Sequence, residues 1–328
     1  MSVDHQPLVT LGDIEAAASR IADLAMRTPV VEVPHPEDAG TVLHCKAESL
    51  QPTGAFKVRG AYNAISLQLD AARERGVVAQ SSGNHGRAVA WLAHRLGLRA
   101  IVVMPDAAPA SKVAAVRALG AEVELVSAHE RDIRPFEIVE ERGSVYVPPY
   151  DDPRVIAGQG TVGLELVEQL PSPDVVLVPV SGGGLISEIA TAVKALSPGT
   201  AVIGVEPELA GDAAESLRTG ERVTWKPERT YRTIADGLRT TSLGVHPWSH
   251  VRAYVDDIIT VSEDEIRAAM RHLALAGRLV AEPAGATATA AWLAGRVPAE
   301  GRVAAVVSGG SVDPALLASV LALTVPPG

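Results

Sequence analysis

The composition of this 328-residue chain favours a folded protein with two cores and excludes several classes of partner. Hydrophobic residues make up 47% of the chain and the formal net charge is -10, which argues against nucleic acids and membranes, because proteins that bind those anionic partners carry basic surfaces. Cys45 is the single cysteine, so no intramolecular disulfide and no cysteine-built metal site is expected. No signal-like segment or membrane-spanning apolar run is evident, and we expect a cytoplasmic protein.

Helical and strand patterns alternate along the first half of the chain. Apolar spacing predicts a helix over residues 11–26, with Thr10 or Asp13 as its cap. The charged segment 129–141 is predicted to be a helix that buries Ile133, Phe136 and Val139. The other helices expected in this half cover residues 61–69, 84–96 and 111–119, and the expected strands cover residues 30–33, 41–46, 76–80, 100–104, 122–126 and 143–147.

A proline-rich break at residues 148–153 precedes a second set of alternating patterns. Ser262, with Glu265 three residues later, predicts a capped helix over residues 262–276. The remaining predictions are helices over residues 163–169, 186–196, 284–294 and 314–323, strands over 175–180, 201–205, 257–261 and 303–307, and irregular structure over 210–240. Strands that alternate with helices predict an α/β protein whose mostly parallel sheets are flanked by helices.

One lysine stands where a glycine-containing loop meets a predicted helix. Lys57 follows Gly54-Ala55-Phe56 and precedes Arg59-Gly60. The positive end of a helix and partial burial both favour the neutral, nucleophilic form of a lysine amine, which is the form that Schiff-base chemistry needs. Taken alone, Lys57 is better explained as an ordinary surface lysine, because lysines are mostly exposed, and only the other motifs reverse this.

A run of glycines joins a very apolar predicted strand to a helix. Ser181-Gly182-Gly183-Gly184-Leu185 follows residues 175–180, and such a loop lets backbone N–H groups close around a phosphate. The G-x-G-x-x-G spacing of a dinucleotide site is absent, and so is the lysine of a P-loop. A tight strand-to-helix turn without a ligand is the remaining alternative.

Four motifs, taken in order, resemble the fold-type-II pyridoxal phosphate (PLP) enzymes, and most of all the threonine/serine dehydratase and serine racemase family. They are Thr53 to Gly60, Ser81-Ser82-Gly83-Asn84-His85-Gly86, Ser181 to Leu185 and Ser308-Gly309-Gly310. The resemblance runs from Arg27-Thr28-Pro29 to Asp313. It implies a two-lobe, tryptophan synthase β-like fold with a large PLP-binding domain (residues 1–68 and 149–328), a small domain (69–148), and a homodimer.

The same resemblance assigns roles to residues of this chain. Lys57 would hold PLP covalently and then remove the substrate's Cα proton, beside Phe56, which packs near the cofactor ring. Asn84 would meet the ring hydroxyl oxygen, and Ser308 the pyridine nitrogen. Ser181, Gly182, Gly183, Gly184 and Leu185 would bind the phosphate, and Ser81, Ser82, Gly83, Asn84 and His85 the substrate carboxylate. We expect His85 to support its loop rather than to act as a base.

Three further positions match the divalent-cation site of serine racemases and some dehydratases. They are Glu206, Ala210 and Asp212, whose two carboxylates and main-chain carbonyl suit Mg²⁺ or Ca²⁺. A solvated acidic loop without a metal is the alternative reading.

These features predict a PLP-dependent ammonia-lyase that eliminates water from L-threonine, L-serine or another hydroxyamino acid, giving a 2-oxo acid and ammonia. The main alternative is an amino-acid racemase that uses Lys57 and Ser82 as opposed acid/base groups. A β-replacement synthase is disfavoured by His85 and Val58, where that class typically has Thr and an acidic residue. A non-catalytic nucleotide-binding protein remains an outside alternative.

Overall fold

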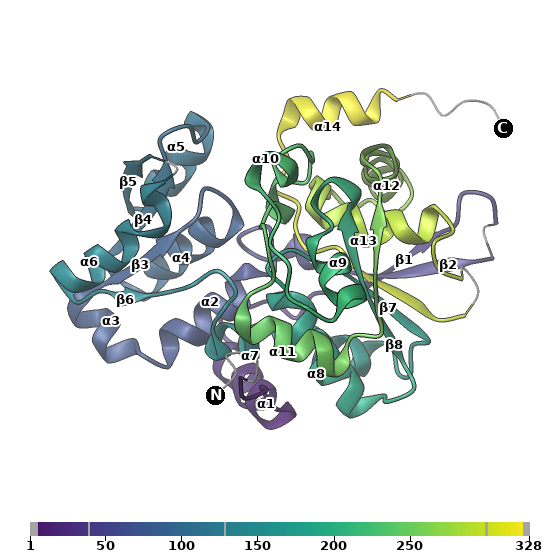
Figure 1. The fold of residues 1–328 in the computed structure, drawn as a ribbon, viewed down its shortest axis with the longest axis horizontal. Helices are drawn as coiled ribbons and strands as arrows, with labels where there is room; N and C mark the ends of the chain where they lie inside the picture. Colours follow the sequence, from purple (N-terminus) through teal and green to yellow (C-terminus); the bar gives the residue numbers. More distant parts are fainter. Residues whose placement is uncertain (1–5, 39, 128, 299–300, 324–328) are drawn as a thin grey trace.

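The computed structural model describes residues 6–38, 40–127, 129–298 and 301–323, which form two lobes, each built around its own sheet (Figure 1). The larger lobe has a six-stranded sheet with the order β1-β2-β10-β7-β8-β9, and the smaller lobe has a four-stranded sheet with the order β5-β4-β3-β6. Apart from the antiparallel β1–β2 pair, neighbouring strands run parallel, and helices flank both sheets. The predicted fold class is confirmed.

The strands of the large sheet come from both ends of the chain, whereas those of the small sheet come from one continuous stretch. The large sheet consists of β1 (Val30–Pro34), β2 (Val42–Lys46), β7 (Val175–Pro179), β8 (Ala201–Pro207), β9 (Asp257–Val261) and β10 (Val303–Val306). The small sheet consists of β3 (Val77–Gln80), β4 (Ala100–Pro105), β5 (Glu122–Val126) and β6 (Val145–Tyr146). Each of these strands overlaps a predicted one.

The helices of the described chain are mostly near their predicted positions. Those before the proline-rich break are α1 (Leu11–Ile21), α2 (Lys57–Ser66), α3 (Leu69–Arg75), α4 (Asn84–Leu96), α5 (Ala110–Ala118) and α6 (Arg134–Arg142). Those after it are α7 (Pro153–Gln169), α8 (Gly184–Leu196), α9 (Asp212–Thr219), α10 (Pro227–Thr230), α11 (Val245–Tyr254), α12 (Glu263–Leu275), α13 (Pro283–Leu293) and α14 (Pro314–Leu321). The predicted capping box of Ser262 with Glu265 is present on α12, and on α1 the predicted cap Thr10 forms a capping box with Asp13.

Several helix boundaries differ from the prediction. Helix α1 ends at Ile21 instead of Met26, and α2 begins at Lys57 itself. Helix α7 begins at Pro153, where Asp152 caps it, ten residues before the predicted start. Glycines interrupt the apolar spacing in the first half of this helix, and the sequence pattern therefore did not predict it. The region 210–240 contains α9 and α10, and therefore the prediction of wholly irregular structure there was wrong.

The predicted buried stripe of the segment 129–141 was wrong for Ile133 and Phe136, whereas Val139 is partly buried and packs against the core. A 3₁₀ turn at Glu130–Asp132 precedes α6, and α6 buries Pro135 and Ile138. Ile133 and Phe136 are exposed, although the Phe136 ring lies against Tyr146 with ring centroids 4.9 Å apart. The 3₁₀ turn shifts the phase of the helix, and Ile133 and Phe136 therefore face the surface.

Helix α2 joins the two lobes. Its residues Val58, Ala61 and Ile65 share a hydrophobic core with α4 and with strands of the small sheet. Its other face packs on α7 so closely that a Cβ atom added to Gly158 would lie 2.6 Å from the Cα atom of Gly60. The lysine at its start therefore lies at the junction of the lobes. The domain boundary at residues 68 and 69 stays a prediction.

The described part of the chain contains no helix long and apolar enough to cross a membrane.

Candidate active site

The loop before Lys57 is held against the end of the central strand β10. The Phe56 N–H donates to the Ser308 carbonyl at 3.1 Å, and the Gly310 N–H donates to the Gly54 carbonyl at 2.8 Å. Between these two bonds, Ala55 and Gly309 form an antiparallel bridge. Two of the predicted motifs, far apart in sequence, are thus brought together by backbone hydrogen bonds.

Lys57 is the first residue of α2, and its amine points into the junction between the lobes. The Nζ atom donates to the Pro149 carbonyl at 2.6 Å and lies 5.0 Å from the centroid of the Phe56 ring. Burial lowers the pKa of Lys57 to about 8, and the carboxyl of Glu188 opposes this shift. A substantial neutral fraction near neutral pH suits a nucleophilic amine.

A buried ionic network fixes α2 two residues beyond the lysine. The Arg59 guanidinium, 1% exposed, donates to Glu48 at 2.8 Å and to Glu165 at 2.7 Å. The Lys46 amine donates a hydrogen bond to the Glu165 carboxylate at 2.6 Å, and the Thr28 hydroxyl donates one to the Glu48 carboxylate at 2.5 Å. Sequence patterns had not revealed this network, because its members lie on separate segments of the chain.

The glycine run forms a cradle between β7 and the start of α8. Gly183 has a φ of +86°, a backbone conformation that residues with a side chain rarely adopt. A Cβ atom added to Gly182 would lie 2.5 Å from the ring of Tyr150, and one added to Gly184 would lie 2.9 Å from the Tyr150 Cβ atom. The first N–H groups of a helix have no intrahelical acceptor. Residues Ser181 to Leu185 therefore fit a phosphate group bound by backbone donors.

The loop at residues 81–85 joins β3 to α4, on the small-lobe side of the junction. The Ser81 hydroxyl accepts a hydrogen bond from the Gly83 N–H at 3.0 Å, which shapes the turn. Asn84 begins α4, and its side-chain amide donates to Glu282 at 2.5 Å. Ser82 is half-buried in this loop, and its proposed position opposite Lys57 stays a prediction.

His85 is buried at the start of α4. Its Nε2 atom pairs with the Val147 carbonyl at 2.8 Å, an arrangement that makes Nε2 the protonated nitrogen. Burial, followed by the nearby charge of Lys57, lowers the pKa of His85 to about 3. So weak a base suits the expected role in supporting the loop, which remains a prediction.

Ser308 and Glu282 lie on the large-lobe side of the same region. Ser308 is 5% exposed and follows β10, the strand at the centre of the sheet. Glu282 caps the start of α13; its N–H donates to the Gly309 carbonyl at 3.0 Å, and its carboxyl receives the Asn84 amide. Burial raises the pKa of Glu282 to about 7, and the charge of Asp236 adds to this shift. The prediction missed Glu282, although the following Pro283 is a typical first residue of a helix.

Two of the predicted cation ligands, Glu206 and Asp212, lie close enough at the end of β8 for their charges to interact, and Ala210 lies in the 3₁₀ turn Glu208–Ala210 between them in sequence. Glu206 accepts from the N–H groups of Ala213 at 3.3 Å and Ala214 at 2.8 Å, and the Asp212 Oδ2 atom has no partner among the described residues. Burial raises the pKa of Glu206 well above its usual value and that of Asp212 to about 7. The described chain holds no cluster of three or more His, Cys, Asp or Glu side chains able to bind a metal. A cation here would thus need the Ala210 carbonyl and water as further ligands.

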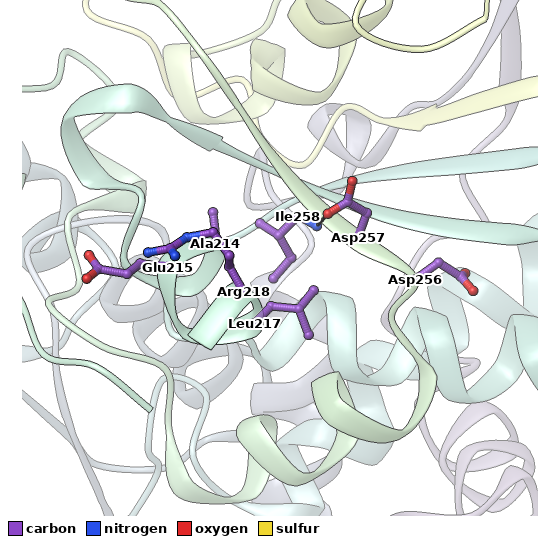
Figure 2. Close-up of a pocket in the computed structure, with 7 residues that line it drawn as sticks. All are labelled: Ala214, Glu215, Leu217, Arg218, Asp256, Asp257 and Ile258. Carbon is purple, nitrogen blue, oxygen red and sulfur yellow. Dashed lines mark hydrogen bonds between the residues drawn. The ribbon is translucent and has the colours of Figure 1, made fainter. Parts of the chain in front are cut away.

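A surface hollow of about 590 Å³ lies elsewhere, between α9 and β9 (Figure 2). Its lining includes Glu215, Arg218, Asp256 and Asp257, and it contains none of the predicted site residues. Figure 2 shows the charged side chains spread around an open depression instead of converging on one point. This hollow is therefore separate from the predicted site at Lys57.

A comparison of the sequence with models of known protein families identifies the family to which the chain belongs. The model of the family "Pyridoxal-phosphate dependent enzyme" matches residues 21–309. The chain therefore belongs to this family of PLP-dependent enzymes, and the residues around Lys57 and the glycine cradle fit that cofactor.

Within this family the chain is similar to threonine dehydratases and serine racemases. It is 42% identical to the catabolic L-threonine dehydratase TdcB of Escherichia coli, over 95% of this chain and 96% of that protein. The structure matches threonine deaminase isoform 2 from Solanum lycopersicum with a TM-score of 0.86 and 35% identity, over 95% of this chain and 87% of that one. It matches maize serine racemase with a TM-score of 0.88 and 40% identity, over 95% of this chain and 97% of that one. The predicted family is confirmed.

Proposed function

We propose that this protein is a PLP-dependent ammonia-lyase that removes water from L-threonine, L-serine or a related hydroxyamino acid. The observation that carries the proposal is the position of the Lys57 amine. It is buried at a helix start, has a pKa lowered to about 8, and lies on a loop fixed to the Ser308 strand end. The similarity to threonine dehydratases over nearly the whole chain supports the substrate class.

In this proposal the residues around Lys57 hold and orient the cofactor. PLP, when bound, withdraws electrons from the Cα atom of an attached amino acid. The cradle Ser181 to Leu185 would bind its phosphate, Asn84 would meet the ring hydroxyl oxygen, and Ser308 would meet the ring nitrogen with a neutral hydroxyl. Phe56 would pack beside the ring. Because a hydroxyl does not hold that nitrogen protonated, this environment favours loss of a β-substituent as the Cα proton leaves.

The reacting amino acid would be held between the lobes. Backbone donors of Ser81, Ser82, Gly83, Asn84 and His85 would bind its carboxylate at the start of α4, where the helix dipole favours an anion. The free Lys57 amine would then accept the Cα proton as the Cα–H bond breaks, and the β-hydroxyl would take up a proton as its C–O bond breaks and leave as water. Hydrolysis of the released product gives the 2-oxo acid and ammonia.

Proton NMR in heavy water tests the reaction directly. L-Threonine and L-serine would be incubated separately with PLP-loaded protein, with a Lys57→Ala variant as control. We expect 2-oxobutanoate from threonine or pyruvate from serine, and neither from the variant. Full turnover by Lys57→Ala would disprove the assigned role of this lysine.

Racemisation is the second candidate function, supported by the similarity to maize serine racemase and by the place of Ser82 in the carboxylate loop. In that case Ser82 would exchange a proton with the opposite face of Cα. Loss of the Cα–H signal without a 2-oxo acid would support the racemase. A Ser82→Ala variant should then lose racemisation while any elimination is retained.

We also propose Mg²⁺ or Ca²⁺ as the ligand of Glu206, Asp212 and the Ala210 carbonyl. The support is the buried pair of carboxyl groups and the unpartnered Asp212 oxygen. A bound cation would offset their repulsion, and added Ca²⁺ should therefore raise the melting temperature of the protein. An Asp212→Asn variant should lose most of that response. An equal response in the variant would argue against the site.

A homodimer and a cytoplasmic location complete the proposal. The free thiol of the buried Cys45 suits a reducing compartment. Light scattering of the purified protein measures the oligomeric state, and the mass of a single chain would exclude the dimer.

A further inference from the structure

Glu188 is a fully buried carboxyl group to which neither the sequence motifs nor the proposed reaction gives a role. It lies in the second turn of α8, and its side chain is 0% exposed. Neither carboxyl oxygen has a hydrogen-bond partner of normal geometry among the described residues, although the Gly160 N–H lies near enough to favour the charged form. The buried Glu48 and Glu206, in contrast, accept hydrogen bonds on both oxygens. Burying a carboxyl group with so few hydrogen-bond partners costs free energy, and a functional role would explain why Glu188 is placed there.

The position of Glu188 connects it to the site already described. Helix α8 begins with the glycine cradle, and side chains on a helix lean towards its N-terminus. The carboxyl of Glu188 is therefore turned towards the cradle end of α8. The Lys57 amine donates to the Pro149 carbonyl at 2.6 Å, and the adjoining Tyr150 packs against Gly184, the first residue of α8, one turn before Glu188. Across this contact the charges of Lys57 and Glu188 act on each other.

Most of the other charged and titratable groups on α8 and on the elements packed against it are engaged elsewhere. Those elements are α1, α7, α11, β7 and β8. Four of these groups form ion pairs: Arg154 with Asp152, Glu165 with Arg59 and Lys46, Glu168 with Arg27, and Lys194 with Asp256. Three form other hydrogen bonds: Arg20 with the Asn63 side chain, His250 with the backbone of Val9 and His246, and Glu206 with the backbone of Ala213 and Ala214. The Arg252 guanidinium lies over the ring of Trp248. Glu15 is exposed, and the Nδ1 atom of His246 has no hydrogen-bond partner among the described residues. His85, on the far side of the lysine, is neutral.

Burial acts on the two groups in opposite directions. It raises the pKa of Glu188 well above its usual value and lowers that of Lys57 to about 8. Each charge partly reverses the shift of the other, because an ammonium favours a carboxylate and a carboxylate favours an ammonium. Burial thus favours the uncharged form of each group, the acid of Glu188 and the amine of Lys57.

We infer that Glu188 is the proton partner of Lys57, a positioning residue that takes up the proton which the ammonium must lose before its amine can react. This inference rests on the proposed function of Lys57. In the transfer an N–H bond of the ammonium breaks and leaves its electron pair on Nζ, while an O–H bond forms on the carboxylate. A neutral amine and a neutral acid result. Because the two groups form no direct hydrogen bond in the described structure, a bridging water would carry the proton and satisfy the orphaned oxygens.

The titration of the lysine amine tests the first half of this inference. The chain has five lysines, and protein labelled with ¹³C at the lysine Cε atoms would therefore give few signals. A Lys57→Met variant identifies the signal of Lys57. In full-length protein stripped of PLP, Glu188→Gln should lower the pH at which Lys57 titrates by about one pH unit, because the variant lacks the carboxylate that favours the ammonium.

A matched control is available one turn along the same helix. Thr191 is buried, and its hydroxyl donates to the Ser187 carbonyl at 2.8 Å, but it has no charge to place near Lys57. A Thr191→Val variant should leave the Lys57 titration unchanged. Equal titration in Glu188→Gln and the unmutated protein, both folded by circular dichroism, would overturn the inference. Glu188→Leu replaces Glu188→Gln if the amide prevents folding.

Infrared difference spectroscopy tests the transfer itself on the PLP-loaded protein. Loading with PLP should add a protonated-carboxyl C=O band, since the lysine proton passes to Glu188, and this band should be absent from Glu188→Gln. A loaded protein without the band would overturn the transfer. Neither readout depends on turnover. A shifted Lys57 titration in a protein that consumes neither threonine nor serine would thus retain the pair while rejecting the proposed reaction.

Discussion

Arg59 illustrates how a residue outside the proposed chemistry can position the lysine on which that chemistry depends. It lies two positions after Lys57, is 1% exposed, and donates hydrogen bonds to Glu48 and Glu165 from separate segments of the chain. Its planar guanidinium is suited to such forked contacts, which a lysine could not reproduce. The first turn of α2, and with it the position of the reactive amine, depends on this anchor.

Replacing Arg59 with methionine should destabilise the protein by roughly 3–5 kcal/mol, because the change leaves the buried Glu48 without its cationic partner and Glu165 with Lys46 alone. Urea unfolding measures the loss. Arg27→Met is the control: its ion pair with Glu168 has side chains 54% and 50% exposed, and its removal should change the unfolding free energy by less than about 1 kcal/mol. Similar losses from both variants would contradict the special role of burial.

At this scale the sequence revealed the lysine but not its surroundings. Lys57, Ser181 to Leu185 and Ser308 lie in contiguous motifs, which a single chain displays openly. Glu188 and Glu282 have no such signature, since their importance comes from burial beside residues that are distant in sequence. A glutamate inside an amphipathic helix looks solvated until the packing on its face is known.

The crossing of α2 and α7 sets the geometry of the site at the level of elements. A Cβ atom on Gly158 would lie 2.6 Å from the Gly60 Cα atom and 2.8 Å from the Arg59 carbonyl oxygen. These glycines allow the two helix backbones to touch. Glycine also weakens a helical pattern, which is why α7 was predicted to begin at Gly163 instead of Pro153.

Gly158→Ala should therefore destabilise the protein by roughly 1–3 kcal/mol, even though alanine favours helices, because the backbones must move apart. Thermal unfolding measures the effect. Gly199→Ala is the matched control, since a Cβ atom there would meet nothing within 4 Å. If Gly158→Ala were as stable as Gly199→Ala, the close crossing would not be a constraint.

The whole molecule contains buried carboxyl groups that make its stability depend on pH. Glu282 has a pKa raised to about 7, whereas in the unfolded chain it titrates at about 4.5. Its contribution is fully present below the unfolded value and is lost as the pH rises through the folded value. Between about pH 5.5 and about pH 8 this single group should remove about 2 kcal/mol of stability.

A Glu282→Gln variant isolates that contribution. Other groups, including His85 with its opposite dependence on pH, remain the same in the variant and the unmutated protein. The loss of unfolding free energy between the two pH values should therefore be smaller in the variant by about 2 kcal/mol, as measured by urea titration. Parallel pH profiles would show that Glu282 titrates normally in the folded protein.

The position of β10 has a consequence for how the protein is made. This strand, residues 303–306, lies between β2 and β7, whereas the small sheet uses only residues 77–146. During synthesis the small lobe can form early. The large sheet remains divided, with β2 and β7 presenting open edges, until the ribosome has released β10. Because the lysine loop pairs with Ser308 and Gly310, just after this strand, the predicted site around Lys57 is complete only once these residues have left the ribosome.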